Sequence, residues 1–508
     1  AVFAAVPDFG PNPTDGERTQ AAAALERVTA TAGAVDGPVT LALPPTVIAE
    51  LEATDPTLVD DLDAAIGPDD LLLALPRVEF DPSSAAAVEL TDDFIQQMVA
   101  GETFLTERFD GVPVARAAWA VDTDLTPDGA STLRDLGIPL LVVPSDRYQS
   151  FDGNIGPFVD TTLLTGAELP DGSLMRMIIV DPIDGRLAPD LDDGFNPTER
   201  AVRIMASTGA VRYGLEPDLR GMVLTAPDLS APDADTVREV ERFVATHPDL
   251  DADTIARLSE INTFFVDQQP HTVQLSSEVA VPLDVRVERS NVLQLLVADT
   301  TSMLPDGDPR PSRWHDELRL AMSTGLTGAE AGAIFTRVDQ ETLALREAIQ
   351  RPESFTFTVA GREANVPVRL ENTSDTALTV DIRLTSDKLS IPGGDLTTVL
   401  APNSITDVPV PVETRSNGVF PVLVEVRTPA GNPLTEPVEM TARVNAITGL
   451  GRVVTVGAVL VLISWWYSYL RRSRARRIAL ASSRHPAGIA ADPNVTPTVP
   501  PNGQERRD

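Results

Sequence analysis

The sequence predicts a multidomain protein with an α/β domain resembling a (β/α) barrel, a helical subdomain, an all-β immunoglobulin-like sandwich and one C-terminal transmembrane helix. Three observations predict this class. Short apolar runs alternate with helical patterns over the first half of the 508 residues, apolar residues alternate with period two beyond residue 352, and an uncharged run lies near the C-terminus. The length also suits several domains, at roughly 100–200 residues each.

Residues 1–268 carry the alternation of strands and helices that is typical of a parallel sheet covered by helices. No Gly-rich phosphate loop follows the first predicted strand, so a barrel of six to eight strands fits better than a nucleotide-binding sheet. The predicted strands are residues 39–43, 71–75, 115–121, 139–143, 175–180 and 222–226. The predicted helices are residues 19–29, 58–66, 91–108, 127–136, 197–207 and 234–246.

Residues 269–352 have helical periodicity, which predicts a helical subdomain against the barrel. Ser312 is expected to cap one helix. Thr327 and Glu330 have the spacing of a capping box for the next helix, which is expected to run to about Gln350.

Residues 353–447 contain six or seven short segments of alternating apolar and polar residues, separated by turn-forming residues. This pattern predicts an immunoglobulin-like β-sandwich. Because the chain has no cysteine, the sandwich is expected to be the variant without an inter-sheet disulfide.

Residues 448–472 are predicted to form a transmembrane helix with its core at residues 453–470, an uncharged run of 18 residues. Such a helix is about 27 Å long, close to the thickness of a bilayer core. Aromatic rings and arginines favour the membrane interface at its end, and excess arginine marks the cytoplasmic side. The interface residues are Trp465, Trp466, Tyr467, Tyr469, Arg471 and Arg472.

The charge distribution agrees with this topology. Residues 471–508 have a net charge of +5, while the preceding 470 residues carry −40. We therefore expect a single-pass protein of the cell membrane, with its N-terminal part outside the cytoplasm and residues 473–508 forming a disordered cytoplasmic tail. An exported N-terminal part needs a signal sequence, and none is visible at Ala1, so we expect a signal sequence and any further N-terminal domain to precede it.

Composition excludes several classes of function. A net charge of −35 argues against a nucleic-acid partner, because nucleic-acid binding needs a basic surface. The absence of cysteine excludes thiolate metal sites, and no two of the four histidines lie within five residues of each other. We therefore expect no metal and no cofactor.

Acidic and basic side chains follow several predicted strands, at the end where barrel enzymes hold their active sites. Two carboxylates at a suitable separation would permit glycoside hydrolysis. Trp119 is a candidate platform for a sugar ring, and Arg77 is a candidate partner for a phosphate or carboxylate. The candidate catalytic residues are Glu79, Asp122, Asp124 and Asp181, and the candidate ligand-binding residues are Arg77, Asp81, Trp119 and Asp228.

Each of these residues also has a structural interpretation. With 75 acidic residues, some carboxylates fall at strand ends by chance, and an Asp in this place also caps the following helix. A tryptophan in the place of Trp119 is more often a core residue at a strand centre, and an arginine in the place of Arg77 more often pairs with a nearby carboxylate, here Glu79 or Asp81. Metal-dependent deacetylation lacks the paired histidines that it needs.

The layout resembles a family of actinobacterial single-pass envelope proteins of unknown function, with a degenerate barrel like those of polysaccharide deacetylases and glycosidases. The resemblance rests on loose motifs that cover most of the chain, at residues 38–51, 71–88, 119–145, 364–386 and 444–472. In this family the gene often neighbours that of a peptidoglycan-precursor lipid flippase, which implies a role near cell-wall assembly.

The leading hypothesis is a non-catalytic, membrane-anchored envelope protein that binds or scaffolds through a pseudo-enzyme barrel. Its partners would be the cytoplasmic membrane, and a cell-wall glycan or another envelope membrane protein. One alternative is an active carboxylate-dependent glycoside hydrolase that acts on envelope polysaccharide. A second alternative is an accessory subunit of a flippase for lipid-linked precursors. Whether the protein is an enzyme is open at this point, although the missing metal ligands favour a binding role.

Overall fold

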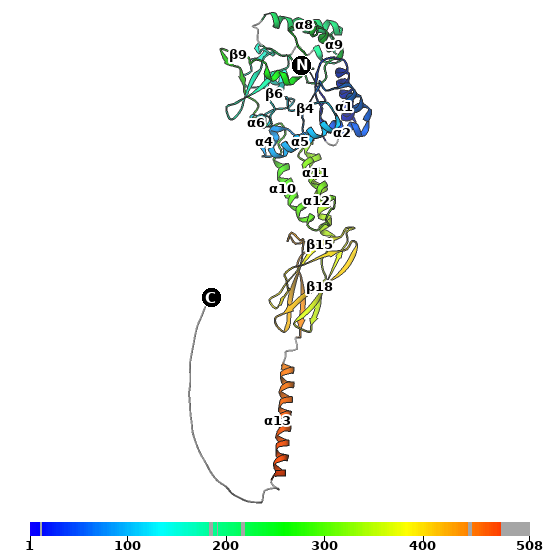
Figure 1. Ribbon diagram of the computed structural model, residues 1–508, viewed down its shortest axis with the longest axis vertical. Helices are drawn as coiled ribbons and strands as arrows, with labels where there is room; N and C mark the ends of the chain where they lie inside the picture. Colours follow the sequence, from blue (N-terminus) through cyan, green and yellow to red (C-terminus); the bar gives the residue numbers. More distant parts are fainter. Residues whose placement is uncertain (11–12, 182–185, 190, 215–218, 446–449, 479–508) are drawn as a thin grey trace, which may run out of the picture.

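The computed structural model describes residues 1–10, 13–181, 186–189, 191–214, 219–445 and 450–478, with the side chains of 208, 210–214, 450–453 and 469–478 left out. Figure 1 shows an elongated molecule. An α/β domain, a group of three long helices, a β-sandwich and a single helix follow one another from the N-terminus.

Two mainly parallel sheets form the centre of the α/β domain. The first has the order β1-β2-β3-β4 and is parallel throughout. In the second, β11-β7-β8-β6-β5, the strands β5, β6 and β8 are parallel and β7 runs antiparallel to β8. The strands are β1 (Val2–Ala5), β2 (Val39–Ala42), β3 (Leu71–Leu73), β4 (Val114–Ala115), β5 (Trp119–Ala120), β6 (Leu140–Val143), β7 (Thr165–Glu168), β8 (Leu174–Ile179) and β11 (Thr272–Val273). A separate hairpin joins β9 (Phe265–Val266) to β10 (Gln269–Pro270).

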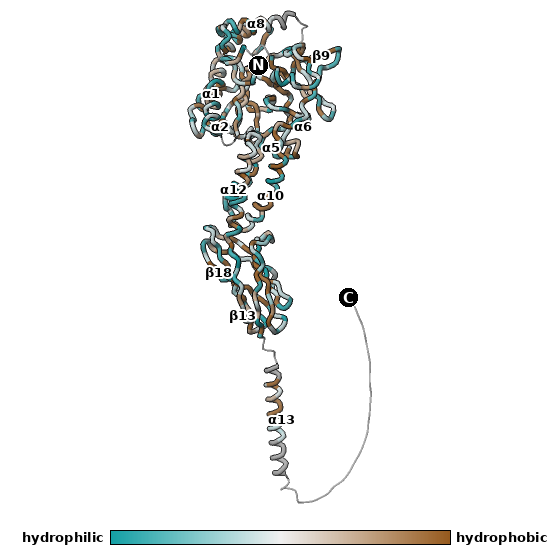
Figure 2. Tube along the Cα trace, turned by 180° about the vertical axis from the view of Figure 1, so that it is seen from behind, coloured by the Kyte–Doolittle hydropathy of each residue, from teal (hydrophilic) through white to brown (hydrophobic). Residues whose placement is uncertain are grey.

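The two sheets together make a barrel-like wall. β4 and β5 are separated by only three residues, so the chain passes directly from one sheet to the other. Beside β1, the Phe3 amide donates to the Leu224 carbonyl (3.0 Å) and the Ala5 amide to the Leu229 carbonyl (2.9 Å). Side chains from β1, β2, β3, β6, β8 and this returning segment share one internal core. In Figure 2 hydrophobic residues gather in the interior of this domain. The coarse prediction of a barrel-like domain is thus confirmed.

Helices cover the outside of the barrel. α1 begins at Asp15, earlier than predicted, because Thr14 and Glu17 form a capping box before it. Sequence periodicity missed β1, β7, α2, α4 and α7, and all of these except α2 have at most six residues. The helices are α1 (Asp15–Ala32), α2 (Pro45–Thr54), α3 (Pro56–Ala65), α4 (Pro82–Ala87), α5 (Thr91–Arg108), α6 (Pro127–Asp135), α7 (Ser145–Ser150), α8 (Pro197–Gly214) and α9 (Ala234–Val244), with 3-10 turns at Gly156–Phe158 and Ile255–Glu260.

Three helices connect the α/β domain to the sandwich: α10 (Asp284–Thr301), α11 (Arg310–Leu320) and α12 (Gly328–Glu347). The helical part thus starts later than residue 269, because β11 still belongs to the barrel sheet. The capping box of Thr327 and Glu330 is confirmed at the start of α12. The predicted cap at Ser312 is wrong, since α11 already begins one turn earlier, behind Pro309.

The sandwich consists of two sheets, with the orders β12-β14-β18-β16 and β13-β20-β19-β15-β17. Buried and exposed residues alternate along β14, as expected for a strand with one face in a core. The strands are β12 (Ile349–Gln350), β13 (Thr356–Val359), β14 (Glu363–Asn372), β15 (Leu378–Thr385), β16 (Leu389–Ser390), β17 (Leu396–Leu400), β18 (Ser404–Thr414), β19 (Gly418–Arg427) and β20 (Val438–Val444). The immunoglobulin-like assignment stays a prediction.

The three helices and the sandwich share one hydrophobic core, to which Val297 of α10, Phe335 of α12 and Val380 of β15 all belong. A buried carboxylate fixes this joint. Asp299 of α10 accepts hydrogen bonds from Thr428 Oγ1 (2.5 Å) and Asn432 Nδ2 (2.8 Å), and it pairs with Arg346 of α12.

The last helix, α13 (Leu450–Ile478), contains the predicted membrane span. Among the described residues, no helix meets the length and apolarity needed to cross a bilayer. Within α13 the side chains are described for residues 454–468, where Trp465, Trp466 and Tyr467 are exposed. The side chains of Tyr469, Arg471 and Arg472, and the predicted tail beyond residue 478, lie outside the described residues.

Candidate functional site

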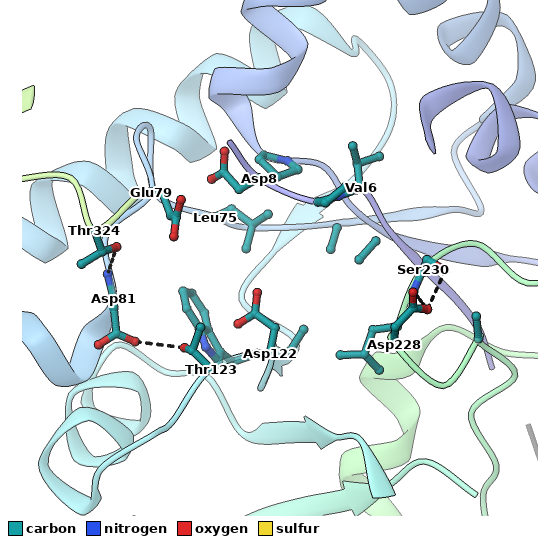
Figure 3. Close-up of a pocket in the computed structure, with 18 of the residues that line it drawn as sticks. Val6, Asp8, Leu75, Glu79, Asp81, Asp122, Thr123, Asp228, Ser230 and Thr324 are labelled. Carbon is teal, nitrogen blue, oxygen red and sulfur yellow. Dashed lines mark hydrogen bonds between the residues drawn. The ribbon is translucent and has the colours of Figure 1, made fainter. Parts of the chain in front are cut away.

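A cavity of about 760 Å³ opens at the carboxyl ends of the barrel strands. Its lining comes from the loops after β1, β2, β3 and β5, and from the segment that returns beside β1. In Figure 3 the side chains of Asp8, Glu79 and Asp122 extend into this space from three different loops. This is the end of the barrel at which parallel strands deliver their following side chains together.

Glu79 and Asp81 lie on the loop between β3 and α4. Asp81 accepts hydrogen bonds from Ser84 N (2.7 Å) and Ser84 Oγ (2.9 Å), so it caps α4 while it also lines the cavity. The Glu79 carboxylate has no hydrogen-bond or ion-pair partner within the described part of the chain, although most of the group is buried. Asp81 therefore has a structural task that Glu79 lacks.

Asp8 follows β1, and its carboxylate lies near that of Glu79 in the same cavity (Figure 3). Its carboxylate accepts hydrogen bonds from Thr46 Oγ1 and from the Phe9 amide, both at 2.8 Å. Burial outweighs these two bonds and raises the pKa of Asp8 to about 6.

Asp122 follows β5. Burial and the charge of Asp81 raise its pKa, while the backbone amides of Asp122 and Thr123 and the charge of Arg147 act in the opposite direction. Arg147 is held nearby because its guanidinium donates to the Asp122 carbonyl (2.8 Å) and to Asp124 (3.0 Å).

The pKa of Glu79 is raised to about 8, first by burial and then by the nearby charges of Asp8, Asp122 and Asp81. Glu79 thus holds its proton at neutral pH. The pKa of Asp122 is raised as well, but three influences oppose that rise, whereas none opposes the rise at Glu79. A carboxyl group that keeps its proton beside a second carboxyl group in the same cavity is an arrangement that general acid–base chemistry can use.

A loop from the helical part, between α11 and α12, supports the chain around Glu79. The Glu79 carbonyl accepts hydrogen bonds from the Thr324 amide (3.0 Å) and from Ser323 Oγ (2.8 Å), and the Asp81 amide donates to Thr324 Oγ1 (3.1 Å). A Cβ at position 325 would lie 2.1 Å from Glu79 Oε2, so any residue larger than glycine there would require the Glu79 carboxylate to shift.

Arg286 of α10 fixes this loop from behind. Its buried guanidinium donates to the carbonyls of Ser323 (2.6 Å) and Leu326 (2.5 Å). The position of Glu79 therefore depends on the helical part as well as on the barrel.

Of the residues predicted from the sequence, five line the cavity: Glu79, Asp81, Trp119, Asp122 and Asp228. Trp119 also packs against Phe94 with ring centroids 6.1 Å apart, so it serves the core and the cavity wall together. Asp228 accepts from the amide (3.1 Å) and hydroxyl (2.7 Å) of Ser230. Their roles in binding or catalysis stay predictions.

Three predicted residues do not line the cavity. Arg77 places its guanidinium over the ring of Phe104, 4.3 Å from the centroid, and does not pair with Glu79 or Asp81. Asp124 forms an ion pair with Arg147 (3.0 Å). Asp181 accepts a hydrogen bond from Thr161 Oγ1 (3.0 Å). A position after a strand did not suffice, because the loop that follows decides which way each side chain turns.

The sequence analysis missed Asp8, Arg27 and Thr324, which also line the cavity. A signal for Asp8 was present: Val6-Pro7-Asp8 repeats the apolar–Pro–Asp pattern of Ala226-Pro227-Asp228. Arg27 lies on α1 and Thr324 on the loop between α11 and α12, and neither carries such a signal. Among the described residues, no three His, Asp or Glu side chains are arranged to hold a metal ion.

Comparison with known proteins gives one family match. Residues 230–474, just under half of the chain, match the model of a family of unknown function, DUF6049. The match includes the α11–α12 loop but not the loops that carry Asp8, Glu79 and Asp122. No curated protein sequence matches this chain.

Several solved structures are distantly similar. A 4-alpha-glucanotransferase from Thermococcus litoralis is 11% identical with a TM-score of 0.41, and the match covers 76% of this chain and 63% of that one. An alpha-mannosidase from Enterococcus faecalis V583 is 9% identical with a TM-score of 0.40, covering 88% and 57%. A protein described as a polysaccharide deacetylase from Mycobacterium smegmatis is 17% identical with a TM-score of 0.32, covering 51% and 88%.

These likenesses agree with the coarse expectation of a chain related to a family of unknown function, with a barrel similar to glycosidase and deacetylase folds. They are too weak to carry an argument about activity. The actinobacterial source and the membrane location stay predictions.

Proposed function

We propose that this protein is a carboxylate-dependent glycoside hydrolase that acts on envelope polysaccharide, with Glu79 as its general acid. The observation that carries the proposal is the raised pKa of Glu79, about 8, in a cavity that it shares with Asp122. A carboxylic acid that stays protonated at pH 7 beside a second carboxylate matches the needs of glycosidic bond cleavage.

In this mechanism Glu79 donates its proton to the glycosidic oxygen as the bond to the sugar breaks. Asp122, ionised, has two possible roles. It attacks the anomeric carbon to form a glycosyl ester, which water deprotonated by Glu79 then cleaves, or it removes a proton from a water that attacks directly. Trp119 offers an apolar face to a sugar ring on the cavity wall. Asp8 and Asp81 add negative charge, which helps to keep the proton on Glu79.

The test is the release of reducing ends from purified envelope glycans by the full chain. We expect Glu79→Gln to lower kcat by about 10²–10⁴-fold, the usual contribution of a positioned acid. Glu26→Gln, on the exposed face of α1, is the matched control and should leave kcat unchanged. Equal activity of the Glu79→Gln and Glu26→Gln proteins would rule out this assignment.

A non-catalytic glycan-binding barrel is the second candidate, and one observation favours it. The pKa values of Asp8, Glu79, Asp81 and Asp122 are all raised, so the surroundings of these four carboxyl groups favour their protonated forms. Protonated carboxyls bind sugar hydroxyls by hydrogen bonds without cleaving the chain. Saturable glycan binding by the wild-type protein, with no release of reducing ends across the pH range, would favour this candidate.

For the location we propose a single-pass anchor at residues 453–470, with the barrel and sandwich outside the cytoplasm. The uncharged run and the arginines after it support this proposal. Protease added to intact spheroplasts should then digest the barrel and spare an epitope placed after residue 508. Digestion of the epitope without digestion of the barrel would show that the C-terminus lies outside the cytoplasm, contrary to this proposal.

A separate proposal is that this protein binds a flippase for lipid-linked precursors as an accessory subunit. It predicts co-purification with a polytopic membrane protein in mild detergent. Recovery of this chain alone would count against it.

A further inference from the structure

One basic side chain lines the acidic cavity without a protein partner. Arg27 lies on α1, seven residues after Gln20, and both line the cavity from the same face of the helix. The Arg27 Nε is buried and makes no hydrogen bond within the described part of the chain. Its guanidinium also forms no ion pair there, although five acidic residues line the same cavity.

The acidic groups of the cavity are engaged elsewhere. Asp228, on the returning segment, is bonded to Ser230, and Asp8 is bonded to Thr46 and Phe9. The pKa shifts of Asp8 and Glu79 arise from burial, hydrogen bonds and other carboxyls, with no contribution from Arg27 among their causes. Arg27 therefore enters the cavity from α1, whereas Glu79 and Asp122 enter it from the loops after β3 and β5.

A buried N–H donor without a hydrogen-bond partner is costly, because the group has lost its hydrogen bonds to water. The cost is recovered if a ligand supplies an anionic oxygen. The planar fork of an arginine matches the two oxygens of a carboxylate or phosphate, and bonds of this kind are among the strongest in proteins.

We propose that Arg27 recognises the acidic group of a charged saccharide, so that the cavity takes a glycan bearing a carboxylate or a phosphate. This inference rests on one part of the proposed function, namely that a saccharide binds in the cavity, and it does not require that the saccharide is cleaved. The cluster of Asp8, Glu79, Asp81 and Asp122 repels an anion, while Arg27 attracts it. The acidic group thus lies at the α1 side, and a neutral linkage is presented to Glu79 and Asp122.

The experiment compares matched ligands. A uronic-acid tetrasaccharide and the same tetrasaccharide with its carboxyl groups reduced to alcohols are titrated by calorimetry into the full chain, in detergent, in the Glu79→Gln background. Glucose 1-phosphate against glucose forms the second arm, which separates recognition of phosphate from that of carboxylate. We expect the acidic member of at least one pair to bind about 10-fold more tightly, as a charge-assisted bond to one arginine allows.

Arg27→Gln should abolish this preference, and Arg27→Lys should keep part of it, because a lysine retains the charge but not the fork. Arg18→Gln is the matched control on the same helix. Arg18 pairs with Glu50 (2.7 Å) and does not line the cavity, so its loss should leave the preference intact. Since the Arg27 guanidinium pairs with no residue that the structure describes, its replacement should not lower the melting temperature.

A preference that survives Arg27→Gln, or equal binding of both members of each pair by the starting protein, would overturn the inference. Absence of any saccharide binding would overturn it as well. These results are distinguishable from failure of the proposed hydrolysis, since the binding assay needs no turnover. If the protein cleaves neutral glycans but does not prefer acidic ones, the proposed hydrolysis stands and the role of Arg27 is refuted. If the protein prefers acidic glycans but cleaves none, the role of Arg27 stands and the proposed hydrolysis is refuted.

Discussion

At the joint between the helices and the sandwich, the carboxylate of Asp299 is bonded by Thr428 and Asn432 and paired with Arg346. In the barrel cavity the carboxylate of Glu79 is also largely buried, yet among the described residues it has neither a hydrogen bond nor a cation to compensate it. Both carboxylates have lost hydrogen bonds to water, but only Asp299 has gained hydrogen bonds to protein groups in their place. Compensated burial at the joint stabilises the fold. Uncompensated burial in the cavity costs stability and yields an altered protonation state, which is the signature of a functional site.

The largest effect is expected at the joint. Asp299→Ala leaves the Arg346 charge partly buried without its partner, so the free energy of unfolding should fall by about 3–5 kcal/mol. Denaturant unfolding of the full chain measures this. Asp316→Ala, on the exposed side of α11, is the control and should change it by less than about 0.5 kcal/mol. Similar values for the two variants would show that the Asp299 network contributes no more than a surface contact.

In the cavity, replacing the buried carboxylate should raise the free energy of unfolding instead of lowering it. The folded-state pKa of Glu79, about 8, lies above its ordinary value of 4.5, so stability associated with this group is present below pH 4.5 and is lost as pH rises toward 8. Glu79→Gln removes that loss and should stabilise the protein by about 2–4 kcal/mol at pH 8, with little change at pH 4.

Thermal unfolding at the two pH values, with Glu26→Gln as control, tests this prediction. A Glu79→Gln protein that is less stable than wild type at pH 8 would mean that the carboxylate is compensated after all.

The smallest effect is expected for a substitution in the loop between α11 and α12, which contacts the chain around Glu79. Gly325→Ala places a Cβ against Glu79 Oε2 and should displace the carboxyl group. We expect kcat to fall about tenfold and the alkaline limb of the pH–rate profile, near pH 8 in the wild type, to move.

Gly332→Ala is the control, because a Cβ there meets nothing within 4 Å and α12 gains about 1 kcal/mol of helix propensity. If the alkaline limb shifts in both variants, or in neither, the loop does not control the position of the Glu79 carboxyl group.

Much of the fold followed from local patterns. Five of the six predicted barrel strands correspond to strands, because continuous apolar runs bounded by Pro and Asp are typical of buried parallel strands. The sixth, residues 222–226, forms only bridges beside β1. β1 itself was missed, since four residues give too short a pattern, and with it Asp8 was missed.

Local sequence by itself determined where carboxylates follow strands, as at Glu79 and Asp122, and where Thr327 and Glu330 cap a helix, because these depend on neighbours a few residues away. Tertiary structure alone decided that Asp8 and Thr324 meet Glu79, that Arg77 turns away, and that Arg27 is left unpaired. Burial and charge act through space, between groups as far apart in the chain as residues 79 and 324. The altered protonation of Glu79 is therefore a property of the folded cavity that its place in the sequence does not contain.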